Sequence, residues 1–379
     1  MRASSKGKKT IVISSNYAWT VYNFRMPLIR RLKSEGYRVA VLTQFDGYEK
    51  KIAAEVDDIK PLFISRKGVN PLVDVLTILN FVEYFLRFKP DVLLSFTIKP
   101  VIYGSIASRL TNVKSIVTIT GLGTTFISNT WITKVVRALY RFALSSVSSI
   151  FFQNDDDKYI FVNQQLIDSQ VCRLTPGSGL DLDKFSYTEP RDTTDMVFLL
   201  IARMLWDKGI AEFVDAAGVI KERYPNTRFQ LLGPLGVENR TSIPRSKMAE
   251  WQKDGIIEYL GETNNVASYI ETACCVVLPS YREGTSRVLL EAAAVGRPII
   301  ATDVPGCREV VTDGITGFLC EARNSFSLSK KMELMLKLSF EKRCMMGVRG
   351  REKVENEFNQ DIVCDQYIEA IKGSNIKNK

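Results

Sequence analysis

A chain of 379 residues is longer than one ordinary hydrophobic core and fits two domains. Its 45% apolar and 25% charged residues are typical of a folded globular protein and exclude a disordered chain or a disulfide scaffold. The formal charge of +9 is uneven: the chain to Leu180 has 24 lysines and arginines against 13 acidic residues, and the rest has 27 against 29. A basic first half favours an anionic partner such as a phospholipid surface, a diphosphate or nucleic acid.

Short apolar runs alternate with helical patterns along the first half. They predict strands at 10–14, 38–43, 91–95, 115–120 and 149–153, with a helix at about 27–35. After the turn-forming segment 175–179 the pattern restarts, with strands at 196–201, 228–232, 256–260, 275–278 and 298–302. A helical period of apolar residues predicts a last helix at 355–371. Strands separated by helices predict parallel sheets covered on both faces.

We therefore expect an α/β protein with two Rossmann-like domains joined near residue 180. The expected domains are residues 1–178 and 179–360, followed by a C-terminal helix and tail at 361–379.

Several chemistries are excluded by the residue inventory. The sequence contains no histidine, which removes Ser-His-Asp and Cys-His catalysis, histidine metal sites and a histidine general base. The seven cysteines include no C-x-x-C pair and are typical of reduced residues in apolar runs. No run reaches the roughly 18 apolar residues of a spanning helix, and no signal peptide is recognised. We therefore expect a cytoplasmic protein.

The most informative segment is 281–298, directly after a predicted strand. Thr285 or Ser286 can cap a helix that Gly296 and Pro298 end. A helix N-terminus at the carboxyl end of a parallel strand presents free N–H groups and the positive end of the helix dipole. This segment therefore predicts a phosphate-binding site.

Charged residues surround that predicted site. Glu283 precedes the helix and Glu291 lies within it, and two carboxylates suit a ligand rich in hydroxyls. Arg203 and Lys208 share the loop after strand 196–201 and can converge on a diphosphate. The alternative for all four is an ordinary solvated surface charge.

In combination, these residues resemble the signature of the family-4 retaining glycosyltransferases, which have the GT-B fold. The resemblance implies two Rossmann-like domains facing each other across a cleft. The resemblance rests on Glu283–Ser286, Glu291, Pro305-Gly306, Glu309 and Asp313–Phe318. It implies that Arg203 and Lys208 hold the donor diphosphate, that Glu283 lies beside the transferred sugar, and that the C-terminal helix crosses back to the first domain. Further donor contacts implied by it are Gly284, Thr285, Ser286, Glu291, Tyr259, Leu260 and Gly261.

The first half matches the family more loosely. Segments 14–25, 95–100 and 120–126 are predicted loops after strands, so we expect them on the acceptor side of the cleft. The acceptor-side candidates are Asn16, Tyr17, Asn23, Arg25, Lys99, Gly121 and Gly123. Many family members place a histidine in this domain beside the transferred sugar. Here Gly121 and Gly123 occupy that region.

The chain looks most similar to bacterial enzymes of lipid-linked surface glycans, including N-acetylgalactosaminyltransferases that act on undecaprenyl-diphosphate sugars. The resemblance implies retaining transfer of a hexose or N-acetylhexosamine from a UDP-sugar to a lipid-linked sugar, as in capsule or O-antigen biosynthesis. No cofactor or metal is expected, and Asp155 to Asp157 are set aside as metal ligands because cations and helix dipoles meet the diphosphate charge. Nucleic acid is not expected as a partner.

Segment 131–144 bears on membrane binding. Its cations Lys134, Arg137 and Arg141 share one helical face. A core face is predicted from Ile132, Val135, Val136, Leu139 and Phe142. We expect peripheral docking on an anionic membrane at the inner face of the plasma membrane, with an ordinary core helix as the alternative.

Two other functions remain open. One is a sugar-nucleotide epimerase or hydrolase of the same fold, and the other is a non-catalytic sugar-nucleotide-binding subunit.

Overall fold

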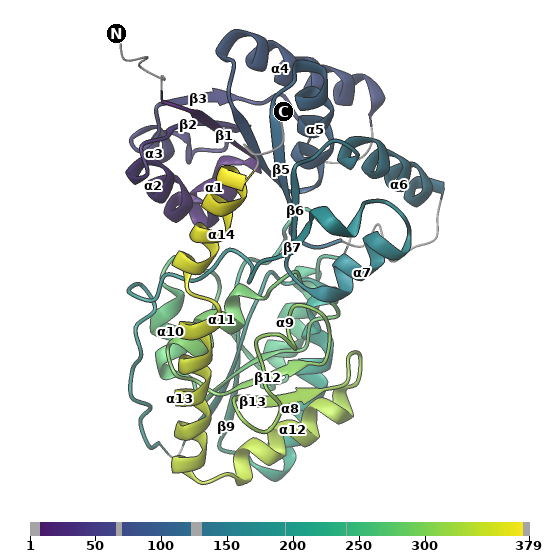
Figure 1. The fold of residues 1–379 in the computed structure, drawn as a ribbon. Coiled ribbons are helices and arrows are strands. Elements are labelled where there is room, and N and C mark those ends of the chain that lie inside the picture. The colour runs from purple at the N-terminus through teal and green to yellow at the C-terminus, as the bar shows by residue number, and fades with distance from the viewer. Residues whose placement is uncertain (1–7, 66–69, 123–130, 194, 240, 374–379) are drawn as a thin grey trace. The chain divides into compact units, whose positions relative to one another are not determined.

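The computed structural model describes residues 8–65, 70–122, 131–193, 195–239 and 241–373 (Figure 1). The chain forms two compact units. Unit 1 contains residues up to Ser178 together with the segment from Gln360 onward, and unit 2 is Gly179–Asn359. Each unit has its own parallel sheet and its own helices.

Unit 1 is built on a seven-stranded parallel sheet with the order β3-β2-β1-β4-β5-β6-β7. The strands are β1 (Thr10–Tyr17), β2 (Arg38–Gln44), β3 (Asp58–Pro61), β4 (Val92–Phe96), β5 (Lys114–Ile119), β6 (Ser149–Phe152) and β7 (Cys172–Leu174). Central strands such as β4 are buried along their whole length because helices cover both faces. The sequence analysis missed β3 and β7, which are short, partly exposed edge strands without an apolar run.

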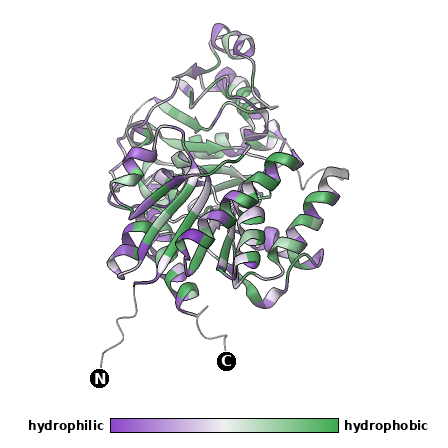
Figure 2. Ribbon diagram, turned by 90° about the horizontal axis from the view of Figure 1, so that it is seen from above, coloured by the Kyte–Doolittle hydropathy of each residue, from purple (hydrophilic) through white to green (hydrophobic). Residues whose placement is uncertain are grey.

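Helices cover both faces of this sheet. They are α1 (Ala18–Phe24), α2 (Met26–Ser34), α3 (Glu49–Ala53), α4 (Pro71–Phe88), α5 (Ile98–Thr111), α6 (Trp131–Leu144), α7 (Asp155–Asn163) and α14 (Gln360–Gly373). One face carries α4 to α7, and the other carries α1, α2, α3 and α14. The ribbons of the helices carry both polar and apolar colours, as amphipathic covers do (Figure 2).

The C-terminal helix α14 returns to unit 1, which confirms the expected crossing. Tyr367 is fully buried there, and its hydroxyl lies 2.6 Å from that of Thr118 on β5. The predicted single helix at 355–371 is wrong, because the chain breaks between α13 and α14. The break has a long-range cause: Leu180 N–H donates to the Phe358 carbonyl at 2.8 Å and forms a β-bridge with Asn359.

Unit 2 has a six-stranded parallel sheet with the order β10-β9-β8-β11-β12-β13, the Rossmann order. Its strands are β8 (Met196–Ile201), β9 (Thr227–Leu232), β10 (Glu258–Tyr259), β11 (Cys275–Leu278), β12 (Ile299–Thr302) and β13 (Gly317–Cys320). Its α-helices are α8 (Ile210–Arg223), α9 (Arg245–Lys253), α10 (Val266–Thr272), α11 (Arg287–Ala294), α12 (Ser325–Lys337) and α13 (Phe340–Glu357). The sequence analysis missed β13, whose four residues begin with a glycine and form no long apolar run.

The predicted core face of α6 needs a correction. Val135 and Phe142 are 42% and 53% exposed, while Thr133 and Tyr140 are buried. The helix is turned so that Tyr140 packs edge-on against Phe161 of α7, with ring centroids 5.1 Å apart. Val136 and Leu139 are partly buried, and the side chain of Ile132 lies outside the described residues. In the described part of the chain, no helix has the length and hydropathy to span a membrane.

Candidate active site

Loops from neighbouring strands of unit 2 lock together at the carboxyl edge of the sheet. The loop after β8 presses against the end of β11, since a Cβ added to Gly209 would lie 2.1 Å from the carbonyl oxygen of Pro279. Gly209 also has φ of +72°, a conformation that favours glycine. Tyr281 N–H donates to the carbonyl of Asp207 at 3.0 Å. The two loops that carry the predicted diphosphate ligands are thus held against each other.

The loop after β12 fixes the segment before α11. A Cβ added to Gly306 would lie 2.5 Å from the Gly284 carbonyl oxygen, so only glycine fits there. Glu283 N–H donates to the Pro305 carbonyl at 3.1 Å, and Ser286 N–H donates to the Gly306 carbonyl at 2.8 Å. These contacts fix the backbone from Glu283 to the first turn of α11.

The N-terminus of α11 lies where the sequence predicted it. Ser286 is the N-cap residue, but its side chain makes no capping hydrogen bond, which corrects the expected capping role. The positive end of the helix dipole lies there, so this end of the helix suits an anion. Gly284 and Thr285 lie in the adjoining loop.

Lys208 and Glu283 form an ion pair across the two loops. Lys208 Nζ lies 2.5 Å from Glu283 Oε1, and each side chain is 17% exposed. Arg203 lies on the same loop as Lys208 and is exposed. Its guanidinium makes no ion pair or hydrogen bond with the residues that the structure describes. The planar guanidinium of Arg203 and the ammonium of Lys208 therefore lie on one loop, with the Glu283 carboxylate beside Lys208.

Glu291 is buried in the second turn of α11. Arg287, one turn earlier, donates from Nε to Glu291 Oε1 at 3.0 Å. Burial raises the pKa of Glu291, and the nearby charges of Arg287 and Lys184 oppose that shift. The sequence analysis did not select Arg287, although its i,i+4 spacing from Glu291 is a signal for such a pair.

The predicted base-side residues gather at the neighbouring strand ends. Tyr259 hydroxyl donates to the Gly233 carbonyl at 2.9 Å, and Gly233 N–H donates to the Gly261 carbonyl at 2.7 Å. Leu260 N–H donates to the carbonyl of Leu231 at 2.9 Å. A Cβ on Gly233 would lie 2.0 Å from the Ala202 carbonyl oxygen, so this loop also contacts the segment before Arg203.

The strand order explains why these groups meet. Strand β8 neighbours both β9 and β11, so the sheet reverses its winding direction there. Arg203 and Lys208 follow β8, and Glu283 follows β11. In doubly wound sheets, ligands bind at the carboxyl ends of the strands at this switch point. All donor-side candidates lie on this edge of unit 2.

The described acceptor-side candidates Asn16, Tyr17, Lys99 and Gly121 gather at the carboxyl edge of the unit 1 sheet. Asn16 N–H donates to Thr97 Oγ1 at 3.1 Å, and the buried Asn16 Oδ1 has no hydrogen-bond partner among the described residues. Tyr17 ends β1, Lys99 lies in the first turn of α5, and Gly121 follows β5 with φ of +121°. Gly123 lies outside the described residues.

One acceptor-side expectation is corrected, and one predicted residue is buried. Segments 14–25 and 95–100 are not loops, since β1 runs directly into α1 and only Thr97 separates β4 from α5. Arg25 is buried, and its guanidinium carbon lies 3.8 Å from the centroid of the Phe96 ring. Phe96 is the last residue of β4, so the Arg25 guanidinium lies at the same carboxyl edge, where it packs on an aromatic ring.

One aromatic and one amide side chain of α1, those of Trp19 and Asn23, complete this edge. Asn23 Nδ2 donates to the Trp19 carbonyl at 2.9 Å within the helix. The sequence analysis did not select Trp19, which is half-exposed at the start of α1. A large exposed aromatic at a strand's carboxyl end is the signal that could have found it.

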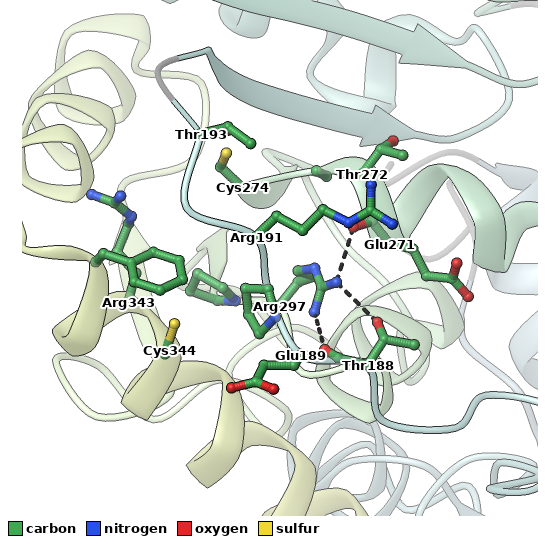
Figure 3. Close-up of a pocket in the computed structure, with 14 residues that line it drawn as sticks. Thr188, Glu189, Arg191, Thr193, Glu271, Thr272, Cys274, Arg297, Arg343 and Cys344 are labelled. Atoms are coloured by element: carbon green, nitrogen blue, oxygen red, sulfur yellow. Dashed lines mark hydrogen bonds between the residues drawn. The ribbon is translucent and has the colours of Figure 1, made fainter.

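A separate cavity of about 380 Å³ lies at the opposite, amino edge of the unit 2 sheet (Figure 3). Arg297 lies at its centre and is almost fully buried. It donates to the carbonyls of Thr188, Val295 and Glu271 at 2.7 to 2.9 Å. Arg297 thus joins an extended segment to the ends of α10 and α11, and none of the predicted site residues lines this cavity.

Comparisons with known protein families agree with the geometry. Residues 183–353 match the family model described as glycosyl transferases group 1, and residues 10–154 match the model described as glycosyl transferase 4-like. The two matches together span most of both units. The chain belongs to the glycosyltransferases. The expected enzyme class is thereby confirmed, and solved structures with the same fold confirm the GT-B fold.

Relatives of this glycosyltransferase include enzymes named for lipid-linked acceptors. It is 25% identical over 366 residues to N,N'-diacetylbacillosaminyl-diphospho-undecaprenol alpha-1,3-N-acetylgalactosaminyltransferase of Campylobacter jejuni, covering 92% of this chain and 94% of the relative. It is 23% identical to UDP-Gal:alpha-D-GlcNAc-diphosphoundecaprenol alpha-1,3-galactosyltransferase of Escherichia coli, over 83% of this chain and 85% of that one.

Solved structures share the fold. Sucrose-phosphate synthase from Thermosynechococcus elongatus has a TM-score of 0.80 at 17% identity, over 97% of this chain and 99% of that one. Anabaena HepE in complex with UDP and glucose has a TM-score of 0.78 at 16% identity, over 96% and 99%.

Proposed function

We propose that this glycosyltransferase moves a hexose or N-acetylhexosamine, with retention, from a UDP-sugar to the sugar of an undecaprenyl-diphosphate-linked acceptor. The observation that carries the proposal is the switch point of unit 2, where Arg203 and the Lys208–Glu283 pair adjoin the N-terminus of α11. That set suits a sugar diphosphate. The names of the Campylobacter and Escherichia relatives support the acceptor class.

In the proposed reaction, cations and backbone N–H groups stabilise the leaving diphosphate. The bond from the sugar C1 to the diphosphate oxygen breaks while C1 bonds to the acceptor oxygen on the same face. Arg203, Lys208 and the first turn of α11 stabilise the negative charge that develops on the diphosphate. Since the sequence has no histidine, the departing phosphate oxygen takes the proton of the acceptor hydroxyl. Glu283 holds Lys208 in place beside the transferred sugar.

Glu291 and the base-side residues would bind the nucleoside. The Glu291 carboxylate is held by Arg287 and suits the ribose hydroxyls as an acceptor. Tyr259, Leu260 and Gly261 would flank the uracil.

We propose that the enzyme needs no metal ion, because positive charge lies where a metal would otherwise neutralise the diphosphate. Within the described ranges, no group of three or more histidine, cysteine, aspartate or glutamate side chains could hold a metal. Asp155 to Asp157 occupy the first turn of α7, where carboxylates stabilise a helix dipole.

We further propose that the enzyme works at the cytoplasmic face of the plasma membrane as a peripheral protein. A lipid-linked acceptor is confined to the bilayer, so the acceptor edge of unit 1 must reach its headgroup region. The excess of basic residues before Leu180 supports attraction to anionic lipid.

Product analysis tests the proposed function. The enzyme is incubated with UDP-galactose, UDP-glucose and their N-acetyl forms, with and without an undecaprenyl-diphosphate-linked sugar, and the products are identified by mass spectrometry. The proposal expects UDP release together with an acceptor that is heavier by one sugar. An isomerised nucleotide sugar without acceptor would instead show an epimerase, and free sugar would show a hydrolase. Nucleotide-sugar binding without turnover would show a silent subunit.

A further inference from the structure

Helix α4 carries two apolar faces, and only one of them is buried. Thr77, Phe81 and Phe85 are nearly or fully buried against the unit 1 core. On the opposite side, five large side chains are between 50% and 78% exposed. We name them the α4 stripe: Leu72, Val75, Leu76, Leu79 and Leu86. Their spacings of three, four, seven and fourteen residues place them along one side of the helix.

Basic and apolar side chains flank the stripe. Arg87 and Lys89 are exposed at the C-terminal end of α4. Helix α5 packs between α4 and α6 on the same face of the sheet, so the outer surfaces of these helices point to the same side of unit 1 (Figure 1). Arg109 of α5 lies 5.2 Å from the ring of the exposed Phe142 on α6. Exposed apolar groups beside cations are typical of membrane-surface binding.

The N-terminal end of the stripe adjoins the candidate acceptor edge. Asp74, in the first turn of α4, lies 3.1 Å from Lys99, in the first turn of α5. Both side chains are largely buried, so the two helix N-termini are fixed to each other. Ile98, beside Lys99, is exposed at this end. Residues that would bind the acceptor therefore lie next to the start of the stripe.

We propose that the α4 stripe lies in the interfacial layer of an anionic bilayer, with α4 parallel to the membrane plane. The acceptor edge of unit 1 then lies at headgroup level, where the diphosphate of a lipid-linked acceptor is found. The stripe and its flanking cations belong to unit 1 alone, and only the reason for docking rests on the proposed function.

Charge favours lipid over a second copy of the chain. Anionic headgroups would neutralise the exposed Arg87, Lys89 and Arg109, whereas the five stripe residues of a second copy carry no charge. Glu83 is an exposed carboxylate within the stripe, between Leu79 and Leu86. It opposes insertion, so binding is shallow and reversible.

Vesicle co-sedimentation tests the surface. Wild type is compared with Leu76→Ser/Leu79→Ser on vesicles of phosphatidylcholine with about 30% phosphatidylglycerol, which supply the anionic surface. The control is Phe326→Ser/Leu334→Ser, which removes two exposed apolar groups from α12 of unit 2. We expect the stripe variant to bind at least about tenfold more weakly and the control to bind like wild type. Glu83→Gln should bind more tightly.

Two further measurements complete the test. Thermal unfolding should be alike in all variants, since the replaced side chains are exposed. Transfer to a short-chain, water-soluble acceptor should survive in the stripe variant. If no protein transfers sugar to any acceptor while vesicle binding follows the stripe, the proposed function fails and the docking surface stands.

Either of two results would overturn the docking surface. One is equal sedimentation of wild type and the stripe variant. The other is a wild-type dimer, seen by light scattering, that the stripe substitutions convert to a monomer. That second result would assign the stripe to self-association.

Discussion

Removal of the Lys208 ammonium is the sharpest test of the diphosphate site. In the structure Lys208 Nζ lies 2.5 Å from Glu283 Oε1, and each of the two side chains is 17% exposed. If Lys208 also contacts the donor diphosphate, Lys208→Ala removes a charge-assisted contact of about 1.5 to 3 kcal/mol. UDP should then bind about 10- to 150-fold more weakly.

Isothermal titration calorimetry with UDP measures this change directly. Arg203→Ala should weaken binding by at least about 1.5 kcal/mol as well, because its guanidinium has no partner among the described residues and is available to the ligand. Arg223→Ala is the matched control, since Arg223 is an exposed residue at the end of α8 that pairs with Glu333 at 3.6 Å. The control should bind UDP like wild type.

Glu283→Gln separates ligand binding from structural support. It leaves Lys208 free to approach phosphate, so UDP binding should be kept or strengthened while sugar transfer falls. The assigned diphosphate site would be refuted if both Lys208→Ala and Arg203→Ala bind UDP with dissociation constants within about twofold of wild type. A twofold change corresponds to about 0.4 kcal/mol, which is less than a charge-assisted contact contributes.

Three further predictions concern the loop, the buried carboxylate and the metal. Gly306→Ala should lower kcat/KM by at least about a hundredfold, because the added Cβ would collide with the Gly284 carbonyl. Gly36→Ala is the control for backbone strain, since Gly36 has φ of +85° and no atom within 4 Å of an added Cβ. Activity and thermal unfolding are measured for both variants. Because burial raises the pKa of Glu291, its contribution to stability is present at low pH and is lost as pH rises through that raised value. The free energy of unfolding of Glu291→Gln, measured in urea titrations, should therefore increase relative to that of wild type as pH rises above 4.5, the ordinary pKa of glutamate, and a constant difference would contradict this. Transferase activity should persist in excess EDTA, and a loss that Mg²⁺ or Mn²⁺ reverses would show that a metal is required.

Local sequence determined the framework of unit 2. Strands β8 and β11 have the predicted bounds because each is a short, continuous apolar run that is buried on both faces. Both ends of α11 were also predictable. Ser286 follows a glycine-containing segment before the helix, and Gly296, which adopts φ of +84°, comes just after it. Arg203, Lys208 and Glu283 could be grouped because carboxyl ends of neighbouring parallel strands share one edge.

Contacts between distant residues decided the rest. Arg25 looked like a ligand beside a strand, but Phe96, 71 positions along the chain, covers its guanidinium. Lys99 was predicted on the acceptor side, and only the packing of α4 on α5 shows that it pairs with Asp74. The break before α14 depends on Leu180, which lies almost half the chain away from Asn359. The sequence shows that α4 and α6 contain apolar residues. Only the packed structure decides which of them contact the core and which stay exposed, because burial depends on the neighbours that the fold supplies.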